Sequence, residues 1–166
     1  MSSRRGYCRP FPSANVTVML KCFTVLLLVG LSLAACDRVD PNSPLGQRKA
    51  IFKQMLKTSE DMGGMLRGRL PFDGARFAEG AVKLDGLSRE PWQHFPQVKD
   101  EGDSSARPEV WERQARFQDL ARQLEGVTGE LVSVTRDQPL EAASLKVPMD
   151  KVEAACKACH TEFRNH

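Results

Sequence analysis

Residues 117–134 read Phe-Gln-Asp-Leu-Ala-Arg-Gln-Leu-Glu-Gly-Val-Thr-Gly-Glu-Leu-Val-Ser-Val and carry the clearest periodic pattern in the chain. Within this stretch, and shortly before it, apolar side chains recur with a seven-residue rhythm. They are Val110, Phe117, Leu120, Leu124, Val127, Leu131 and Val134. Because steps of three and four residues bring side chains to one face of an α-helix, the pattern predicts an amphipathic helix that begins at about Glu109.

Three further stretches show helical periodicity. The first starts at Ser43-Pro44, because Ser suits the N-cap and Pro the first helical position, and it ends before Pro71. The second has Asp73 as its N-cap, and the last starts at Asp137 and Pro139. Their predicted inner faces are Phe52, Met55, Leu56, Ser59, Met62, Met65 and Leu66, then Phe77, Ala81, Leu84 and Leu87, and finally Val152, Ala155, Cys156, Cys159 and Phe163.

These patterns define the fold class. No stretch alternates apolar and polar residues with a period of two, so no strand is predicted. Four amphipathic helices without strands specify an all-α fold, an antiparallel up-down four-helix bundle with residues 88–108 as a long connection. Pro148 removes one helical hydrogen bond, so we expect the last helix to bend there, with the segment from Met149 onward packing independently.

The motif Cys156-Lys157-Ala158-Cys159-His160 lies in the last predicted helix. Cys-x-x-Cys-His is the attachment sequence for c-type haem, in which two thiols form thioethers with one porphyrin and the adjacent His binds the iron. A redox dithiol fits less well, since such a pair follows a strand in an alternating α/β pattern. A zinc site would need a further ligand, and only His94 and His166 could add nitrogen. We therefore predict one covalent haem c per chain, near the C-terminal helix.

An export signal precedes the helical part. Residues 23–33 are apolar and uncharged, which suits a signal peptide and is too short to span a bilayer comfortably. Positive charge precedes them at Arg4, Arg5, Arg9 and Lys21. Leu33-Ala34-Ala35-Cys36 then resembles the lipobox of bacterial lipoproteins, whose Cys is joined to diacylglycerol after cleavage on its N-terminal side. An ordinary cleavable signal with a chance cysteine is the alternative.

This interpretation divides the chain into three parts. Residues 1–35 are the signal peptide, with Met19 favoured as the true start; residues 36–43 are a lipidated tether; and residues 44–166 are the helical domain.

The whole chain has a net charge of +3, but the mature part has 20 basic and 21 acidic side chains. Lys and Arg are scattered rather than clustered, so nucleic-acid binding is not predicted. Two acyl chains would make membrane attachment essentially permanent.

The sequence resembles the class II c-type cytochromes, and within them the cytochrome c′ family, over about residues 44–165. The matching motifs are Arg48-x-x-x-Phe52, Arg67-Gly68 before Pro71-Phe72-Asp73, Pro91-Trp92-x-x-Phe95, Ala106-Arg107-Pro108-Glu109-Val110-Trp111, and Cys156-Lys157-Ala158-Cys159-His160 followed by Phe163-Arg164. The resemblance implies covalent haem on Cys156 and Cys159, with His160 as the axial iron ligand. Pro148 and Glu153 depart from the family, which usually has Ala-like and Gly residues there.

The resemblance also bears on the sixth iron ligand. Low-spin members of the class have a ligating Met at the position of Phe52, and a phenyl ring cannot bind iron. The resemblance thus implies five-coordinate, high-spin iron that binds small neutral ligands such as nitric oxide, with Trp92 and Phe95 completing an apolar distal wall. Met55 lies three residues after Phe52, so the alternatives are a wall residue and a sixth ligand.

The remaining expectations also follow from the resemblance. Arg48 and Arg164 are placed at the haem periphery, Arg48 to pair with a propionate and Arg164 on the same helical face as His160. We expect a homodimer, anchored through Cys36 to a membrane in the bacterial periplasm, that binds a gas and exchanges single electrons with a partner protein. It is expected to be a binding protein more than an enzyme. The alternatives are a low-spin electron-transfer cytochrome with Met55 on the iron, and a non-haem lipoprotein bundle.

Overall fold

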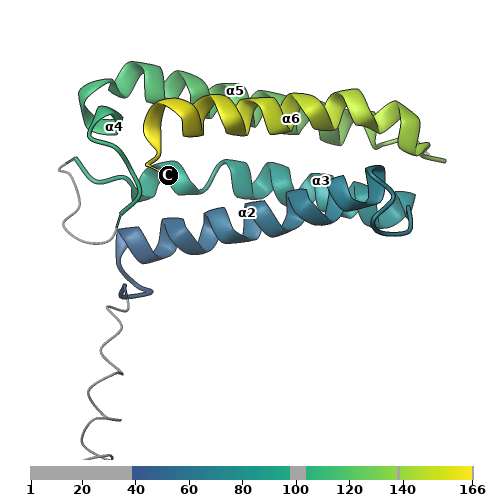
Figure 1. Ribbon diagram of the computed structural model, residues 1–166, viewed down its shortest axis with the longest axis horizontal. Helices are drawn as coiled ribbons and strands as arrows, with labels where there is room; N and C mark the ends of the chain where they lie inside the picture. Colours follow the sequence, from purple (N-terminus) through teal and green to yellow (C-terminus); the bar gives the residue numbers. More distant parts are fainter. Residues whose placement is uncertain (1–38, 98–103, 138, 166) are drawn as a thin grey trace, which may run out of the picture. The chain divides into compact units, whose positions relative to one another are not determined.

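The computed structural model describes residues 39–97, 104–137 and 139–165. Its helices are α2 (Pro44–Leu66), α3 (Gly74–Ser88), η1 (Pro91–His94), α4 (Glu109–Glu112), α5 (Gln114–Val134) and α6 (Ala142–Phe163). The four long helices pack in a ring in the order α2, α3, α5, α6, and successive ones run in opposite directions (Figure 1). The predicted all-α, up-down four-helix bundle is confirmed. The predicted leader, Met19 and Cys36 lie outside the described residues.

The first two helices begin where their capping residues predict. Ser43 Oγ accepts a hydrogen bond of 3.0 Å from the backbone N–H of Gly46, and Pro44 is the first helical residue. Asp73 Oδ1 accepts a hydrogen bond of 3.0 Å from the N–H of Arg76 in the same way. Gly68 has φ +71°, a left-handed conformation that Gly adopts without steric strain, and it turns the chain just after α2.

The predicted third helix is divided. A continuous helix was expected from Glu109, but the backbone of Arg113 leaves the helical region (φ −122°, ψ 48°) and separates α4 from α5. The break brings Arg113 against the end of α6, where its guanidinium lies 5.6 Å from the ring centroid of Phe163. These tertiary contacts override the helical preference of the local sequence.

The prediction for the last helix was wrong in two respects. The helix begins at Ala142 rather than at Asp137 and Pro139. Pro148 lies inside this one helix, and the expected bend there stays a prediction. The segment from Met149 does not pack independently, because Leu145, Met149 and Val152 are all 1% exposed or less and belong to one core cluster. Burial of these side chains outweighs the interior proline, which costs about 3 kcal/mol.

The interior has two parts. The main core, shared by the four long helices, contains Ile51, Met55, Met62, Met65, Phe77, Ala81, Leu84, Leu87, Leu124, Leu131, Leu145, Met149 and Val152. A second group, called here the aromatic cluster, contains Val110, Phe117, Leu120 and Phe163, with Trp92 and Phe95 against it. It thus collects side chains from α4, α5, the end of α6 and the η1 connection.

The connection between α3 and α4 is partly ordered by the aromatic cluster. Phe117 packs edge-on against Trp92 at 5.7 Å and against Phe95 at 4.9 Å between ring centroids. This packing gives a short 3-10 helix to a stretch that was expected to be a plain connection. Within the described ranges, no helix is long and apolar enough to cross a bilayer.

Candidate functional site

A cavity of about 610 Å³ lies in the half of the bundle that holds the aromatic cluster. Its walls come from α2, α3, η1, the segment 104–106, α4, α5 and α6, and they are mostly apolar. Cavities of about 300–1,000 Å³ with a few polar groups are typical of sites for small molecules and cofactors. This cavity is therefore the candidate site, and the predicted site residues can be tested for their position against it.

The Cys-x-x-Cys-His motif faces this cavity. Cys156, Cys159 and His160 all line it; the two thiols are partly buried and His160 is more exposed. Val152 and Phe163, one turn to either side, are buried in the main core and in the aromatic cluster respectively. Because these anchors fix the rotation of α6, the helix presents both sulfur atoms and the imidazole to the same space.

The electrostatic environment of the thiols bears on their chemistry. Burial raises the pKa of Cys156, and the carboxylate of Glu153 adds to the effect. Burial, followed by the neighbouring Cys156 and Glu162, raises the pKa of Cys159 to about 11. Both are free thiols. A redox Cys-x-x-Cys pair needs a thiol with a lowered pKa, because the thiolate is the nucleophile. Here the pKa of both thiols is raised instead, which disfavours the redox-dithiol alternative.

The predicted distal residues lie together on the same cavity. Phe52 and Met55 come from α2, Trp92 and Phe95 from η1 and its end, and all four line the cavity. Phe52 packs edge-on against Trp92 with 6.1 Å between ring centroids, and Met55 is 6% exposed in the main core. The structure brings these four residues and the Cys-x-x-Cys-His motif to one site, as the sequence predicted; their roles remain predictions.

The two predicted peripheral arginines differ in how they are held. Arg48 is 3% exposed, and its guanidinium donates hydrogen bonds to the carbonyl of His94 (3.0 Å) and to Ser104 Oγ (3.1 Å). It also lies 4.6 Å from the ring centroid of Phe95. Arg164 lines the cavity, but its backbone is extended, so it does not share a helical face with His160 as expected. Helix α6 has ended at Phe163, and a backbone bridge joins Arg164 to Ala106.

The chemistry of the side chains at the cavity tests whether it fits a haem. Cys156 and Cys159 are free thiols, and they line the cavity together with the imidazole of His160. Two thiols and an adjacent imidazole are the groups that a c-type haem needs for its thioether bonds and its iron. The residues present therefore fit a covalently bound haem c.

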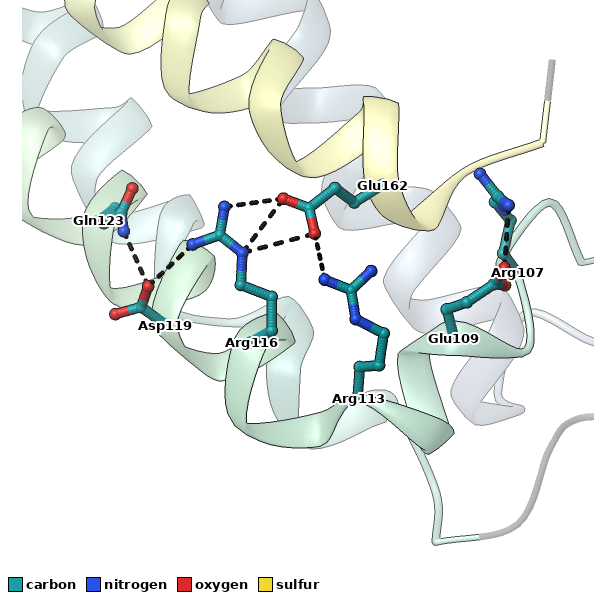
Figure 2. Close-up of polar contacts among 7 residues, drawn as sticks. All are labelled: Arg107, Glu109, Arg113, Arg116, Asp119, Gln123 and Glu162. Atoms are coloured by element: carbon teal, nitrogen blue, oxygen red, sulfur yellow. Dashed lines mark hydrogen bonds and ion pairs between the residues drawn. The ribbon is translucent and has the colours of Figure 1, made fainter.

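Polar contacts that fix the end of α6 were not predicted. Glu162 accepts hydrogen bonds from Arg116 Nη2 (2.7 Å) and from Arg113 Nη2 (2.8 Å), and Arg116 also bonds Asp119 (3.2 Å), as Figure 2 shows. The hydrogen bond from Arg116 is the main cause that lowers the pKa of Glu162, and the same bond raises the pKa of Arg116. The network ties α6, close to the Cys-x-x-Cys-His motif, to the start of α5.

A second unpredicted contact lies at the cavity itself. Arg67 Nη1 donates a hydrogen bond of 3.0 Å to Glu153 Oε1, and both residues line the cavity. Neither contact was predictable from a sequence pattern, because the partners are 86 and 46 residues apart. The departure of Glu153 from the family pattern was the available indication. The segment 104–106, which also lines the cavity, was expected only as part of a connection.

A four-helix bundle that gathers two cysteines and the adjacent histidine on one apolar cavity defines a class of protein, the helical-bundle c-type cytochromes. The sequence profile of the family described as Cytochrome C' matches residues 43–164. The cytochrome c' of Rhodopseudomonas palustris is 33% identical over 141 residues, which are 84% of this chain and 90% of that protein. The chain therefore belongs to the cytochrome c′ family, whose members carry a covalently bound haem c.

Solved structures agree with this assignment. Cytochrome c prime from Shewanella frigidimarina has a TM-score of 0.71 and 26% identity, and the match covers 78% of this chain and 99% of that one. The nitric oxide complex of a single-residue variant of cytochrome c prime from Alcaligenes xylosoxidans has a TM-score of 0.68 and 25% identity, covering 78% and 98% of the two chains. The resemblance inferred from sequence motifs is confirmed.

Proposed function

We propose that this chain is a haem c protein with five-coordinate iron that binds small neutral ligands, nitric oxide first among them. Bound at the cavity, haem c supplies an iron atom whose vacant position takes such a ligand. Cys156 and Cys159 would hold the group as thioethers, and His160 would be the single axial ligand from the protein. Support also comes from the Alcaligenes xylosoxidans relative, a variant of which is described as a nitric oxide complex.

Phe52 is the observation that carries the proposal. It lines the cavity from α2, at the family position where low-spin members have a ligating Met. Its ring is held by the edge-on contact with Trp92 and by packing on the main core. A phenyl ring in that place offers the iron no donor atom and keeps water from the site, so a small apolar gas competes well there.

Absorption spectroscopy of the ferrous protein tests the proposal. The account predicts a broad high-spin band that changes when nitric oxide is added. A sharp, split low-spin pair of bands that nitric oxide leaves unchanged would contradict it. Haem staining after denaturing electrophoresis is the accompanying control, because only covalently attached haem remains with the polypeptide under these conditions.

Met55 supports a second candidate function, that of a low-spin electron-transfer cytochrome. The residue lines the same cavity one helical turn from Phe52, and its sulfur is a possible iron ligand. Its burial in the main core at 6% exposure is equally expected of a packing residue. The variant Met55→Leu separates the two. A packing role leaves the spectrum high-spin in both proteins, whereas a ligand role converts a low-spin spectrum to a high-spin one.

The proposal includes a location in the cell and an attachment to the membrane. We place the protein in the bacterial periplasm, with residues 1–35 removed, Cys36 lipidated, and residues 36–43 joining the membrane to domain 44–166. There it would exchange single electrons with a partner protein. Radiolabelled palmitate incorporated by the wild type and not by Cys36→Ser would support the anchor, while equal labelling would exclude Cys36 as its site.

We also propose a homodimer. Leu56 on α2 and Val82 on α3 are 59% and 60% exposed, and large exposed apolar side chains on the first two helices suit an interface there. Sedimentation velocity of the protein lacking its lipid measures the oligomeric state, and a monomer at micromolar concentration would refute this part of the proposal.

A further inference from the structure

The four residues before α2 form a turn that is tied to the helix. The N–H and the Oγ of Ser43 both donate to the carbonyl of Asp40, at 3.0 and 2.6 Å, and the N–H of Asn42 donates to Asp40 Oδ1 at 2.9 Å. Gln47 Nε2 donates to the carbonyl of Asn42 at 3.0 Å, which joins the turn to the first residues of α2. Residues 40–43 therefore belong to the folded bundle and do not extend the tether.

Gly46, in the first turn of α2, leaves the space that this turn occupies. A Cβ at position 46 would stand 2.9 Å from Pro41 Cα and closer still to the carbonyl oxygen of Asp40. Both neighbours are backbone atoms, so no side-chain rotation relieves the contact, and a side chain here would push the turn off the helix. Glycine is a poor helix former, and the close approach of the two backbones explains its place in α2.

The turn stands at the same end of the bundle as the cavity. Helix α2 begins and α6 ends at this end, as Figure 1 shows. Leu45 and Arg48, from the start of α2, line the cavity, and so does His160, which lies close to the end of α6 at Phe163. The lining residues that the structure describes include neither Gly46 nor any residue of the turn, so the turn leaves the cavity open.

The folded turn shortens the connection between the bundle and the proposed lipid anchor at Cys36. Residues 37–39 alone separate Cys36 from Asp40, and an extended chain spans at most about 3.6 Å per residue, which keeps Asp40 within about 14 Å of Cys36. Without the turn, the chain up to Pro44 would allow about twice that distance. Helix α2 has 23 residues and is about 34 Å long, so its far end is free to lie away from the membrane while the cavity end is not.

We propose that the cavity end of the bundle is a membrane-facing surface, held beside the lipid headgroups by the anchor at Cys36 and the turn at residues 40–43. Its partner is a lipid surface. The cavity then opens next to the bilayer, in whose hydrocarbon a small apolar gas is more soluble than in water. Ligand that collects in the membrane thus reaches the cavity without first diffusing through the periplasm. The inference deepens the proposed function and rests on its lipid anchor.

Energy transfer from the membrane to the haem tests this orientation. The lipidated holoprotein is placed in phosphatidylcholine vesicles that contain a small fraction of lipid with a fluorescent headgroup, and quenching by the haem reports its distance from the headgroups. The wild type should quench strongly. A variant with twenty Gly and Ser residues inserted between Arg38 and Val39 gains about 25 Å of average reach, so its quenching should fall by about half or more.

The variant Gly46→Ala tests the turn itself. Its Cβ displaces the turn and lengthens the connection, so quenching should fall toward that of the insertion variant. Gly86→Ala on α3 is the matched control, because a Cβ there meets no described atom within 4 Å, and it should quench as the wild type does. Haem content, palmitate incorporation and Tm are measured for each variant, so that loss of haem, anchor or fold is separated from a change of orientation.

The outcomes separate this inference from the rest of the proposed function. Equal quenching by the wild type, the insertion variant and Gly46→Ala would overturn the orientation and leave the anchor and gas binding standing. A wild type that carries palmitate and hardly quenches would overturn it as well. A chain that takes up no palmitate would overturn the anchor together with this inference, while the absorption spectrum of the same protein decides gas binding separately.

Discussion

Helix α6 is held very differently by its two neighbours. On the side of α5, Glu162 receives hydrogen bonds from Arg113 and Arg116 at 2.8 and 2.7 Å (Figure 2). On the same side, Phe163 packs on Phe117 with 5.4 Å between ring centroids. On the side of α2, a cavity separates the helices and one exposed ion pair bridges its edge. The helix with the Cys-x-x-Cys-His motif is therefore fixed on the side of α5 and borders a cavity on the side of α2.

The residue types explain why α6 is held firmly on the side of α5 and borders a cavity on the side of α2. Aromatic rings and a multiply bonded carboxylate resist displacement, so they set the position of the two thiols and the imidazole. The α2 side offers Phe52 and Met55, which pack without directional bonds and provide an apolar surface. A firmly held α5 side and an apolar α2 side suit a site that keeps its cofactor in place while small molecules bind and dissociate. The following predictions test this contrast.

Removing the thiols should have the largest effect. In the double variant Cys156→Ser with Cys159→Ser, no covalent haem should remain, because serine hydroxyls do not form the thioether bonds. Haem staining after denaturing electrophoresis measures the loss. Cys36→Ser is the control and should retain its full haem stain. Haem that survives denaturation in the double variant would mean that the cavity is not the attachment site.

Disrupting the aromatic cluster should strongly weaken the fixed side. Phe117 is 2% exposed and contacts Trp92, Phe95 and Phe163 edge-on. Phe117→Ala removes those contacts and leaves a cavity, so the free energy of unfolding should fall by about 3–5 kcal/mol. Denaturant unfolding monitored by far-UV circular dichroism measures it. A loss below about 1 kcal/mol would show that the cluster does not hold α5 and α6 together.

A change on the α2 side should alter ligand binding more than stability. In Phe52→Met, a thioether replaces the ring at the cavity wall and can bind the iron, so the spectrum should become low-spin. If the sulfur is bound about 90% of the time, the apparent affinity for carbon monoxide falls about tenfold. Equilibrium titration measures this value. An unchanged spectrum and affinity would mean that position 52 does not face the iron.

The smallest predicted effect concerns pH and the start of α4. The pKa of Glu109 lies below its ordinary value of 4.5, first because of a backbone hydrogen bond at the helix start and then because of Arg107, which it meets at 2.9 Å. A lowered pKa contributes stability above pH 4.5 that is lost as the pH falls through the folded-state pKa. Glu109→Gln should therefore show a smaller drop in Tm between pH 6 and pH 3 than the wild type. Equal pH profiles of Tm for Glu109→Gln and the wild type would show that the carboxylate of Glu109 contributes nothing to stability.

Local patterns accounted for most of the fold. Ser43 and Asp73 cap helices as their side chains predict, and the motif around Cys156 faces the cavity because α6 carries its apolar residues at helical spacing. The division at Arg113 and the continuity of α6 through Pro148 were not predictable in this way, since tertiary contacts outweigh local preference at both places.

The sequence predicted which residues belong to the site, but it did not predict the contacts that hold them in place. Phe52, Trp92 and Cys156 were each expected at one pocket, and the structure places them on its walls. The ion pairs of Glu153 and Glu162 escaped prediction because charged partners far apart in sequence leave no periodic signal. The extended backbone of Arg164 likewise depends on its bridge to Ala106 in a distant loop.

X-ray absorption at the iron edge of the ferrous protein is the most direct test of the account. The central claim is that His160 is the single protein ligand of the iron and that the α2 wall provides none. The predicted result is a first shell of nitrogen atoms alone, from the porphyrin and His160. A sulfur atom in that shell would contradict the claim, and its loss in Met55→Leu would identify Met55 as the ligand.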